Sequence, residues 1–181
     1  MNDSVTAFRC QMKEKKRPAF IAVGSNLGDR IGNCREAIRL VCQTPGVKHV
    51  AVSSLYETAP VGIASDKRFI NAVFEVSTTL TPLELMEVLL RVEKKMGRDR
   101  SLGPDRVIDL DLLAVEGEAR MPDEKGDLEL PHPRFSERDF VLVPWAEIAP
   151  QFVPEGFDLT ISQILEKLTV FDASMKKVEE S

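Results

Sequence analysis

The sequence predicts an α+β fold in which an antiparallel sheet carries helices on one face, with a further strand and helix toward the C-terminus. Two observations support this prediction. Apolar runs of strand length alternate with two amphipathic stretches of helical period, and Gly or Pro residues mark the boundaries between them. The resulting order of strand, helix, strand, strand, helix, strand is that of the ferredoxin-like βαββαβ arrangement.

The first half of this order occupies residues 19–55. A continuous apolar run, AFIAV, predicts a strand, and the GSNLGD turn after it ends at Asp29, which can cap the following helix. Pro45 and Gly46 end that helix, and residues 47–55 alternate well enough to predict a second strand. The apolar stripe of the helix consists of Ile31, Cys34, Ala37, Ile38 and Val41.

The second half runs from residue 69 to residue 115. Residues 69–78 predict a strand, and a capping box formed by Thr81 and Glu84 starts a helix that Gly97 ends. Residues 108–115 predict the last strand of the motif. Its side chains should alternate strictly between the two faces of the sheet. One face would carry Ile108, Leu110, Leu112 and Ala114, and the other would carry Asp109, Asp111, Leu113 and Val115.

The remaining segments are shorter and less regular. Residues 121–127 predict a polar loop within a hairpin, and LPHPRFSERDF, from Leu130, predicts a short helical turn. The apolar run FVLVPWAEIAP is expected to pack as a last strand and turn, and residues 160–168 predict an amphipathic helix. We expect residues 1–17 to form a disordered tail, residues 18–170 a single domain, and residues 171–181 a fraying tail.

Composition excludes several classes of function. The 181 residues are 43% hydrophobic and 29% charged, as in an ordinary globular protein, and the net charge of −5 argues against general nucleic-acid binding. No apolar run reaches the length of a membrane span. Cys10, Cys34 and Cys42 lack any metal-binding spacing and read as reduced thiols, which predicts a cytoplasmic protein.

Two aspartates near the start of the last predicted strand are the strongest chemical signal. Asp109 and Asp111 stand two residues apart, so their carboxylates should face the same way with Cα atoms about 6.6 Å apart. Such a pair suits a hard cation such as magnesium. The loop before them carries Arg98, Arg100 and Arg106, which could bind phosphate through bidentate hydrogen bonds. The alternative is a solvated strand end beside a basic loop.

Further residues favour a nucleotide-dependent transfer site. Arg138 adds another cation, and His132 is held between two prolines. Phe69, Asn71 and Phe140 offer two aromatic faces and an amide for a flat heterocycle. Each residue alone would more often be structural, so the prediction depends on their joint occurrence.

The sequence closely resembles the 6-hydroxymethyl-7,8-dihydropterin pyrophosphokinases of the folate pathway over residues 19–168. The matching segments are IAVGSNLGD, SSLYETAPVG, FINAVFEV, EKKMGRDR, GPDRVIDLDLL, LPHPRFSERDFVLVPWAEIAP and QIL. The resemblance implies magnesium-dependent transfer of pyrophosphate from ATP to the pterin hydroxyl, with AMP and the pterin diphosphate as products. It implies ATP and the pterin as partners, with no nucleic acid or membrane. We expect a monomer or weak homodimer.

The resemblance also assigns roles to individual residues. Asp109 and Asp111 match the pair that binds two magnesium ions, and Asp109 also lies at the pterin. The catalytic set would be these aspartates with Arg98 and Arg106. ATP contacts would come from Glu93, Arg98, Arg100, Arg106, Leu112, His132 and Arg138. The pterin would lie between Phe69 and Phe140, with Asn71 at its edge and with the backbone of Thr58, Ala59, Pro60 and Val61 beside it.

The chain departs from the family pattern at several positions. Ala59-Pro60 replaces a Pro-Pro found in some members, and Leu102 and Gly103 stand near the place of a loop tryptophan. The arginine loop is shorter and reads Pro-Asp-Arg instead of Pro-Arg. Leu90 replaces a nucleotide-contacting glutamine. These differences bear on loop closure and nucleotide affinity.

Two other functions remain open at this stage. One is a non-catalytic ferredoxin-like module that senses a ligand or binds RNA, which gives no reason for the paired aspartates. The other is a phosphotransferase that moves only the γ-phosphate, which would yield ADP instead of AMP.

Overall fold

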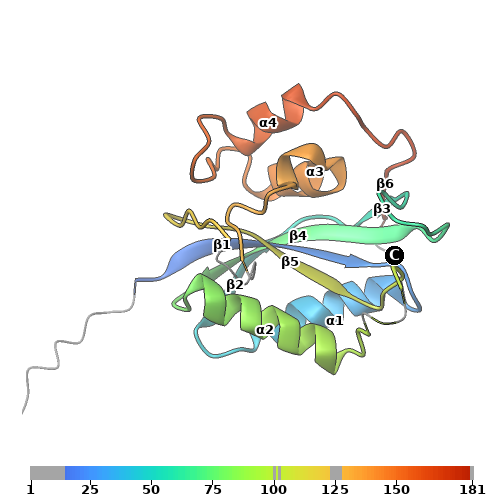
Figure 1. Ribbon diagram of the computed structural model, residues 1–181, viewed down its shortest axis with the longest axis horizontal. Helices are drawn as coiled ribbons and strands as arrows, with labels where there is room; N and C mark the ends of the chain where they lie inside the picture. The colour runs from blue at the N-terminus through green and yellow to red at the C-terminus, as the bar shows by residue number, and fades with distance from the viewer. Residues whose placement is uncertain (1–14, 100, 102, 123–127, 180–181) are drawn as a thin grey trace, which may run out of the picture.

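The computed structural model describes residues 15–99, 101, 103–122 and 128–179, and it confirms the ferredoxin-like α+β architecture (Figure 1). The predicted N-terminal tail lies mostly outside the described residues, and Arg17 already belongs to the first strand. In chain order the elements are β1 (Arg17–Ser25), α1 (Arg30–Cys42), β2 (Val47–Val52), β3 (Tyr56–Thr58), β4 (Phe69–Thr78), α2 (Pro82–Lys95), β5 (Asp109–Val115), η2 (Phe135–Glu137), α3 (Asp139–Ile148), α4 (Ile161–Lys167) and β6 (Lys176–Lys177).

The sheet has the strand order β5-β1-β4-β3-β6, and β2 also pairs with β4. All of these pairings are antiparallel. β1 occupies one edge of β4, while β2 and β3 follow one another along the other edge. The strand predicted for residues 47–55 ends at Val52, and β3 at Tyr56–Thr58 is an additional short strand beyond the predicted range. Ser53 marks the break, since it still exchanges backbone and hydroxyl hydrogen bonds with Val73 before the chain leaves the ladder.

Helices cover both faces of the sheet, whereas the sequence predicted them on one face. Figure 1 shows α1 and α2 on one face and α3 and α4 on the other. The prediction of a strand and turn in FVLVPWAEIAP was wrong, because this segment forms α3. Val141, Leu142 and Trp145 are buried at helical spacing against the sheet. The segment is apolar at nearly every position, so its period does not distinguish a helix from a strand.

The two helical layers enclose two separate hydrophobic cores. Ile21, Phe74 and Leu112 point toward α1 and α2, whereas Phe20 and Val73 point toward α3 and α4. Strict alternation fails in β5. Ile21 pairs with Leu112 and Phe20 pairs with Ala114, so Leu113 is an extra residue in a β-bulge. The bulge places Leu113 and Ala114 in the core under α3 and Val115 in the core under α1 and α2. The predicted faces of Ala114 and Val115 were therefore interchanged.

The local signals for the helix ends are confirmed. Asp29 caps α1 by accepting a hydrogen bond from Gly32, and Thr81 and Glu84 form the predicted capping box of α2. Gly97 follows α2 with a φ of 87°, a left-handed conformation that suits glycine. None of the helices in the described ranges is long and apolar enough to cross a membrane.

The C-terminal segment, which we expected to fray, contacts the domain as far as residue 178. Lys176–Lys177 form β6, which pairs with Tyr56 and Glu57 of β3, and the Val178 amide donates to the Leu55 carbonyl at 2.8 Å. Figure 1 shows β6 beside β3 at one end of the sheet.

Candidate active site

The site lies where the sheet face beneath α3 changes from apolar to polar. Along β1 this face carries Phe20, Ala22 and then Gly24, while along β4 Val73 is followed by Asn71 and Phe69. The part of this face that carries Phe20 and Val73 belongs to the hydrophobic core. The part that carries Gly24, Asn71 and Phe69 lines a cavity of about 250 Å³. Strand alternation therefore brings distant parts of the sequence to one polar surface.

Most of the sequence-predicted residues meet at this cavity. The cavity is lined by Thr58, Ala59, Val61, Phe69, Asn71, Arg106, Asp109, Asp111, His132, Arg138 and Phe140. Four other predicted residues, Pro60, Glu93, Arg98 and Leu112, are not among its lining residues. Leu112 faces the opposite core, because it differs by one position from Asp111 in the strand. Arg100 lies outside the described residues.

Three arginine side chains lie beside the two carboxylates. Asp109 accepts from Arg98 at 3.0 Å through Oδ1 and from Arg106 at 2.8 Å through Oδ2. Asp111 lies 3.8 Å from Arg138. Burial and the neighbouring charge of Asp109 raise the pKa of Asp111, against the opposing effect of His132 and Arg138. The site therefore holds positive and negative groups close together.

Arg98 is fixed more firmly than Arg106. Its side chain is only 11% exposed, and its Nη1 donates to the Ile108 carbonyl at 2.9 Å. Glu93 lies 3.5 Å from the Arg98 Nε and accepts from the Leu110 amide at 2.8 Å. Glu93 and Arg98 thus connect the end of α2 to the start of β5, and Arg98 holds the Asp109 carboxylate in place.

Each aromatic wall of the cavity is covered by an arginine. The Arg106 guanidinium lies 5.2 Å from the centre of the Phe69 ring, and that of Arg138 lies 5.6 Å from the centre of the Phe140 ring. The buried Nε of Arg106 makes no hydrogen bond within the described part of the chain. A ligand with anionic oxygens could satisfy this donor, because a buried donor without a partner is unfavourable.

Asn71 is held at the floor of the cavity. It is 9% exposed, and its Nδ2 donates to the Thr58 hydroxyl at 2.8 Å. Thr58 is itself almost fully buried. The orientation of the Asn71 amide is therefore set by its hydrogen bond to Thr58 of β3.

His132 is positioned by backbone contacts. Its amide donates to the Leu113 carbonyl at 2.8 Å, and its Nδ1 accepts from the Arg134 amide at 3.1 Å. An accepting Nδ1 places the proton of the neutral ring on Nε2, which can then donate to a ligand. Burial lowers the pKa of His132, although the charge of Asp111 acts in the opposite direction.

Sequence reasoning missed three residues that shape this site. Gly24 lies between Asn71 and Asp109 in the sheet, and a Cβ there would meet the Asn71 Oδ1 at 2.7 Å. Asn26 is buried and holds the arginine loop, since its side chain donates to Asp105 at 2.7 Å and accepts from the Arg106 amide at 2.7 Å. The GSNLGD segment contains both Gly24 and Asn26, but it was interpreted only as a turn.

Asp105, the third missed residue, connects two loops. Ser65 donates to its Oδ1 at 2.5 Å and Lys67 approaches its Oδ2 at 2.7 Å. Hydrogen bonds from Lys67 and Ser65 lower the pKa of Asp105 to about 2. The unusual Pro-Asp-Arg sequence therefore ties the arginine loop to the loop that precedes β4.

The donor set fits a hard divalent cation that brings some of its own ligands. Asp109 and Asp111 supply carboxylate oxygens on one face, and no cluster of three or more His, Cys, Asp or Glu side chains occurs among the described residues. Magnesium commonly takes one or two carboxylates and completes its shell with water and phosphate oxygens. The site thus suits magnesium bound together with a phosphate-bearing ligand.

Residues 20–150 match the family described as 7,8-dihydro-6-hydroxymethylpterin-pyrophosphokinase. A protein of Methylorubrum extorquens named 2-amino-4-hydroxy-6-hydroxymethyldihydropteridine pyrophosphokinase is 45% identical over 152 residues, which cover 83% of this chain and 92% of that protein. A Bacillus subtilis protein of the same name is 44% identical over 76% of this chain and 81% of its own length.

Larger proteins contain a similar module. A mitochondrial folate synthesis bifunctional protein of Arabidopsis thaliana is 40% identical over 81% of this chain, which corresponds to 26% of that protein. Among solved structures, wild-type Plasmodium falciparum HPPK-DHPS with pteroate superposes with a TM-score of 0.66 at 15% identity, over 84% of this chain and 42% of that one. This second similarity shows the fold, and the chain spans less than half of that structure.

Proposed function

Because the chain belongs to the 7,8-dihydro-6-hydroxymethylpterin-pyrophosphokinase family, we propose that it transfers pyrophosphate from ATP to the hydroxyl of 6-hydroxymethyl-7,8-dihydropterin. The products would be AMP and the pterin diphosphate, in folate biosynthesis. The observation that carries this proposal is that one cavity brings Asp109 and Asp111 together with two aromatic rings, each covered by an arginine.

The pterin is assigned to the half of the cavity between Phe69 and Phe140. Its ring would displace Arg106 from Phe69 and stack there, because a flat heterocycle gains more from an aromatic face than from solvent. Asn71, oriented by Thr58, would hydrogen-bond the edge of the ring. The backbone of residues 58–61 would complete the same edge.

The nucleotide phosphates are assigned to the arginine side of the cavity. Arg106 would exchange its contact with Asp109 for phosphate oxygens, and its unsatisfied Nε offers an additional donor. Arg138 and the Nε2 of His132 would contact the phosphates from the opposite wall. Arg98 is already committed to Glu93 and Ile108, so we assign it to orienting Asp109 as well as to charge.

Asp109 and Asp111 would hold magnesium, up to two ions, with the remaining ligands supplied by water and phosphate. Magnesium supplies charge neutralisation and alignment of the attacking and leaving oxygens when it is bound. In the transfer, the pterin hydroxyl oxygen forms a bond to the β-phosphorus and the bond to the oxygen of AMP breaks. The hydroxyl proton is released to solvent. Alignment and charge neutralisation are the main contributions that the protein makes.

Product analysis tests the proposal. The protein is incubated with ATP, magnesium and the pterin alcohol, and nucleotides are separated by chromatography. Pterin-dependent AMP, absent with EDTA and in the Asp111→Ala variant, is the expected result. ADP in place of AMP would mean transfer of the γ-phosphate alone. Ligand binding without turnover by folded wild-type protein would favour the non-catalytic module.

We also propose the domain bounds, the oligomeric state and the cellular location of the protein. We assign residues 18–170, together with Arg17 of β1 and the segment to residue 178 that pairs with β3, to one catalytic domain that acts as a monomer or weak homodimer in the cytoplasm. The acidic net charge and the cysteines without metal-binding spacing support this assignment.

A further inference from the structure

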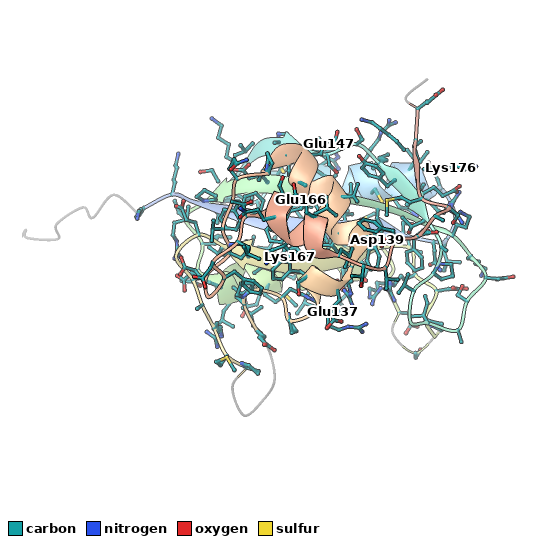
Figure 2. The ribbon with its side chains drawn as sticks, turned by 90° about the horizontal axis from the view of Figure 1, so that it is seen from above. Glu137, Asp139, Glu147, Glu166, Lys167 and Lys176 are labelled. Carbon is teal, nitrogen blue, oxygen red and sulfur yellow. The ribbon has the colours of Figure 1, made fainter. Side chains whose placement is uncertain are left out.

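The C-terminal segment that follows α4 contacts β3 and Ala59, and Thr58 of β3 and Ala59 line the cavity. Lys176–Lys177 pair with β3, and the Val178 amide reaches Leu55. This segment lies beyond residues 20–150, which match the family. Figure 2 labels Asp139, at the start of α3, and Lys176, both toward the right of the view.

Asp172 connects two walls of the cavity. Its Oδ2 accepts from the Ala59 amide at 2.7 Å, and its own amide donates to the Oδ2 of Asp139. Asp139 is only 5% exposed, and its Oδ1 accepts from the Phe140 amide at 2.7 Å. One tail residue thus links the loop that begins at Ala59 to the start of the helix that carries Phe140.

The same segment also holds the other end of this loop. Arg68 donates to the Ser174 carbonyl at 2.8 Å and to the Ser174 hydroxyl at 2.9 Å. Ser174 in turn donates from its amide and hydroxyl to the Oδ1 of Asp172, at 2.8 and 2.6 Å. Residues 59–68 are therefore fixed at both ends by a pre-formed turn, and Phe69 follows directly.

The contact with Asp172 requires a residue other than proline at position 59. Proline has no amide hydrogen, so a chain with Pro-Pro at positions 59 and 60 could not make this hydrogen bond. Proline would instead fix the backbone by its ring. Ala59 therefore supplies the amide that this contact needs, and the tail constrains the loop through it.

We propose that Asp172 is a positioning residue for the heterocyclic substrate, and that it acts by holding the Ala59 end of the binding loop against the wall that carries Phe140. This inference rests on the proposed function, because it takes the pterin to be the ligand between these walls. Asp172 itself does not line the cavity. Its effect is on the geometry of the substrate site and not on the transfer step.

Steady-state kinetics on the full chain test this role. Asp172→Ala should raise the KM for the pterin by about three- to tenfold, the worth of one hydrogen bond, while kcat and the KM for ATP stay unchanged. Asp172→Asn retains one acceptor oxygen and should fall between Asp172→Ala and wild type. Lys176→Ala is the matched control, because its exposed side chain lies in the same segment and the strand pairing uses its backbone. Its pterin KM should equal that of wild type.

A second substitution isolates the contact. In an Ala59→Pro background the amide is absent, so adding Asp172→Ala should not change the pterin KM further. Hydrogen exchange at the Ala59 amide, measured without any ligand, should be faster in Asp172→Ala than in Lys176→Ala. Equal pterin KM values in Asp172→Ala and wild type, or parallel increases in the KM values of both substrates, would overturn the inference. Wild-type protein that makes no AMP would overturn the proposed function instead, and the exchange measurement would still report whether the contact forms.

Discussion

Replacing Gly24 by alanine should damage pterin recognition without unfolding the protein. The added Cβ would lie 2.7 Å from the Asn71 Oδ1, whereas ordinary contact begins at 3.4 Å, so the amide must move by about 0.7 Å. Gly24 lies within strand β1 and pairs with Asn71 and Asp109. Alanine is acceptable to a strand backbone, and the effect should come from the displaced amide.

The magnitude follows from the partner of that amide. Asn71 donates to Thr58 at 2.8 Å in a buried position, and loss of a buried hydrogen bond costs about 1–3 kcal/mol. If substrate binding must restore the amide position, the pterin KM should rise by roughly five- to hundredfold. The KM for ATP should change much less, because the nucleotide is assigned to the arginine side.

The assay is pterin-dependent AMP formation by Gly24→Ala, Asn71→Ala and the double variant. Asn71→Ala removes the atom that clashes, so Gly24→Ala should add little in that background. Thermal unfolding of each variant verifies the fold. An unchanged pterin KM in Gly24→Ala would refute the reasoning, and so would additive effects in the double variant.

Other substitutions probe the remaining parts of the structure. Asp109→Ala and Asp111→Ala should each lower magnesium-dependent turnover by at least about a hundredfold. Thermal unfolding should show a retained fold, because both carboxylates line a cavity and not the core. Near-wild-type turnover in either variant would contradict the metal assignment. Trp145→Ala should destabilise the protein by about 3–5 kcal/mol in urea unfolding, because its fully buried ring packs on Phe20 at 5.3 Å between centroids. Burial raises the pKa of the Cys34 thiol to about 12, so this thiol should resist alkylation at pH 8 until the protein is unfolded, as peptide mass analysis would show; rapid labelling of folded protein would contradict its burial.

The parts of the fold that depend on local chemistry could be predicted from the sequence. The caps at Asp29 and Thr81 involve neighbouring residues, and the aspartate pair in β5 follows from strand alternation. The cavity residues Phe69, Asn71 and Phe140 were identified by residue type and by resemblance. Phe69 and Asn71 lie on β4, and their meeting with Phe140 depends on the packing of α3 against that strand.

The parts that were missed depend on contacts between distant segments. The bulge at Leu113 reflects the fit of β5 to β1, and the helix at 139–148 is decided by packing on Phe20 and Val73. Asp105 has partners at positions 26, 65 and 67, which a linear pattern does not reveal. The same holds for Asp172, whose position in a polar C-terminal segment resembled an ordinary tail.

The arginines stacked on Phe69 and Phe140 make ligand binding at this site an exchange of partners. Arg106 contacts both the ring that is assigned to the pterin and the carboxylate that is assigned to the cation. A phosphate that withdraws this guanidinium would release both surfaces at once. Nucleotide and pterin would then each raise the affinity for the other, and this linkage must be equal in both directions. Because Arg106 covers both subsites in the free protein, binding of either ligand would require the same side chain to move.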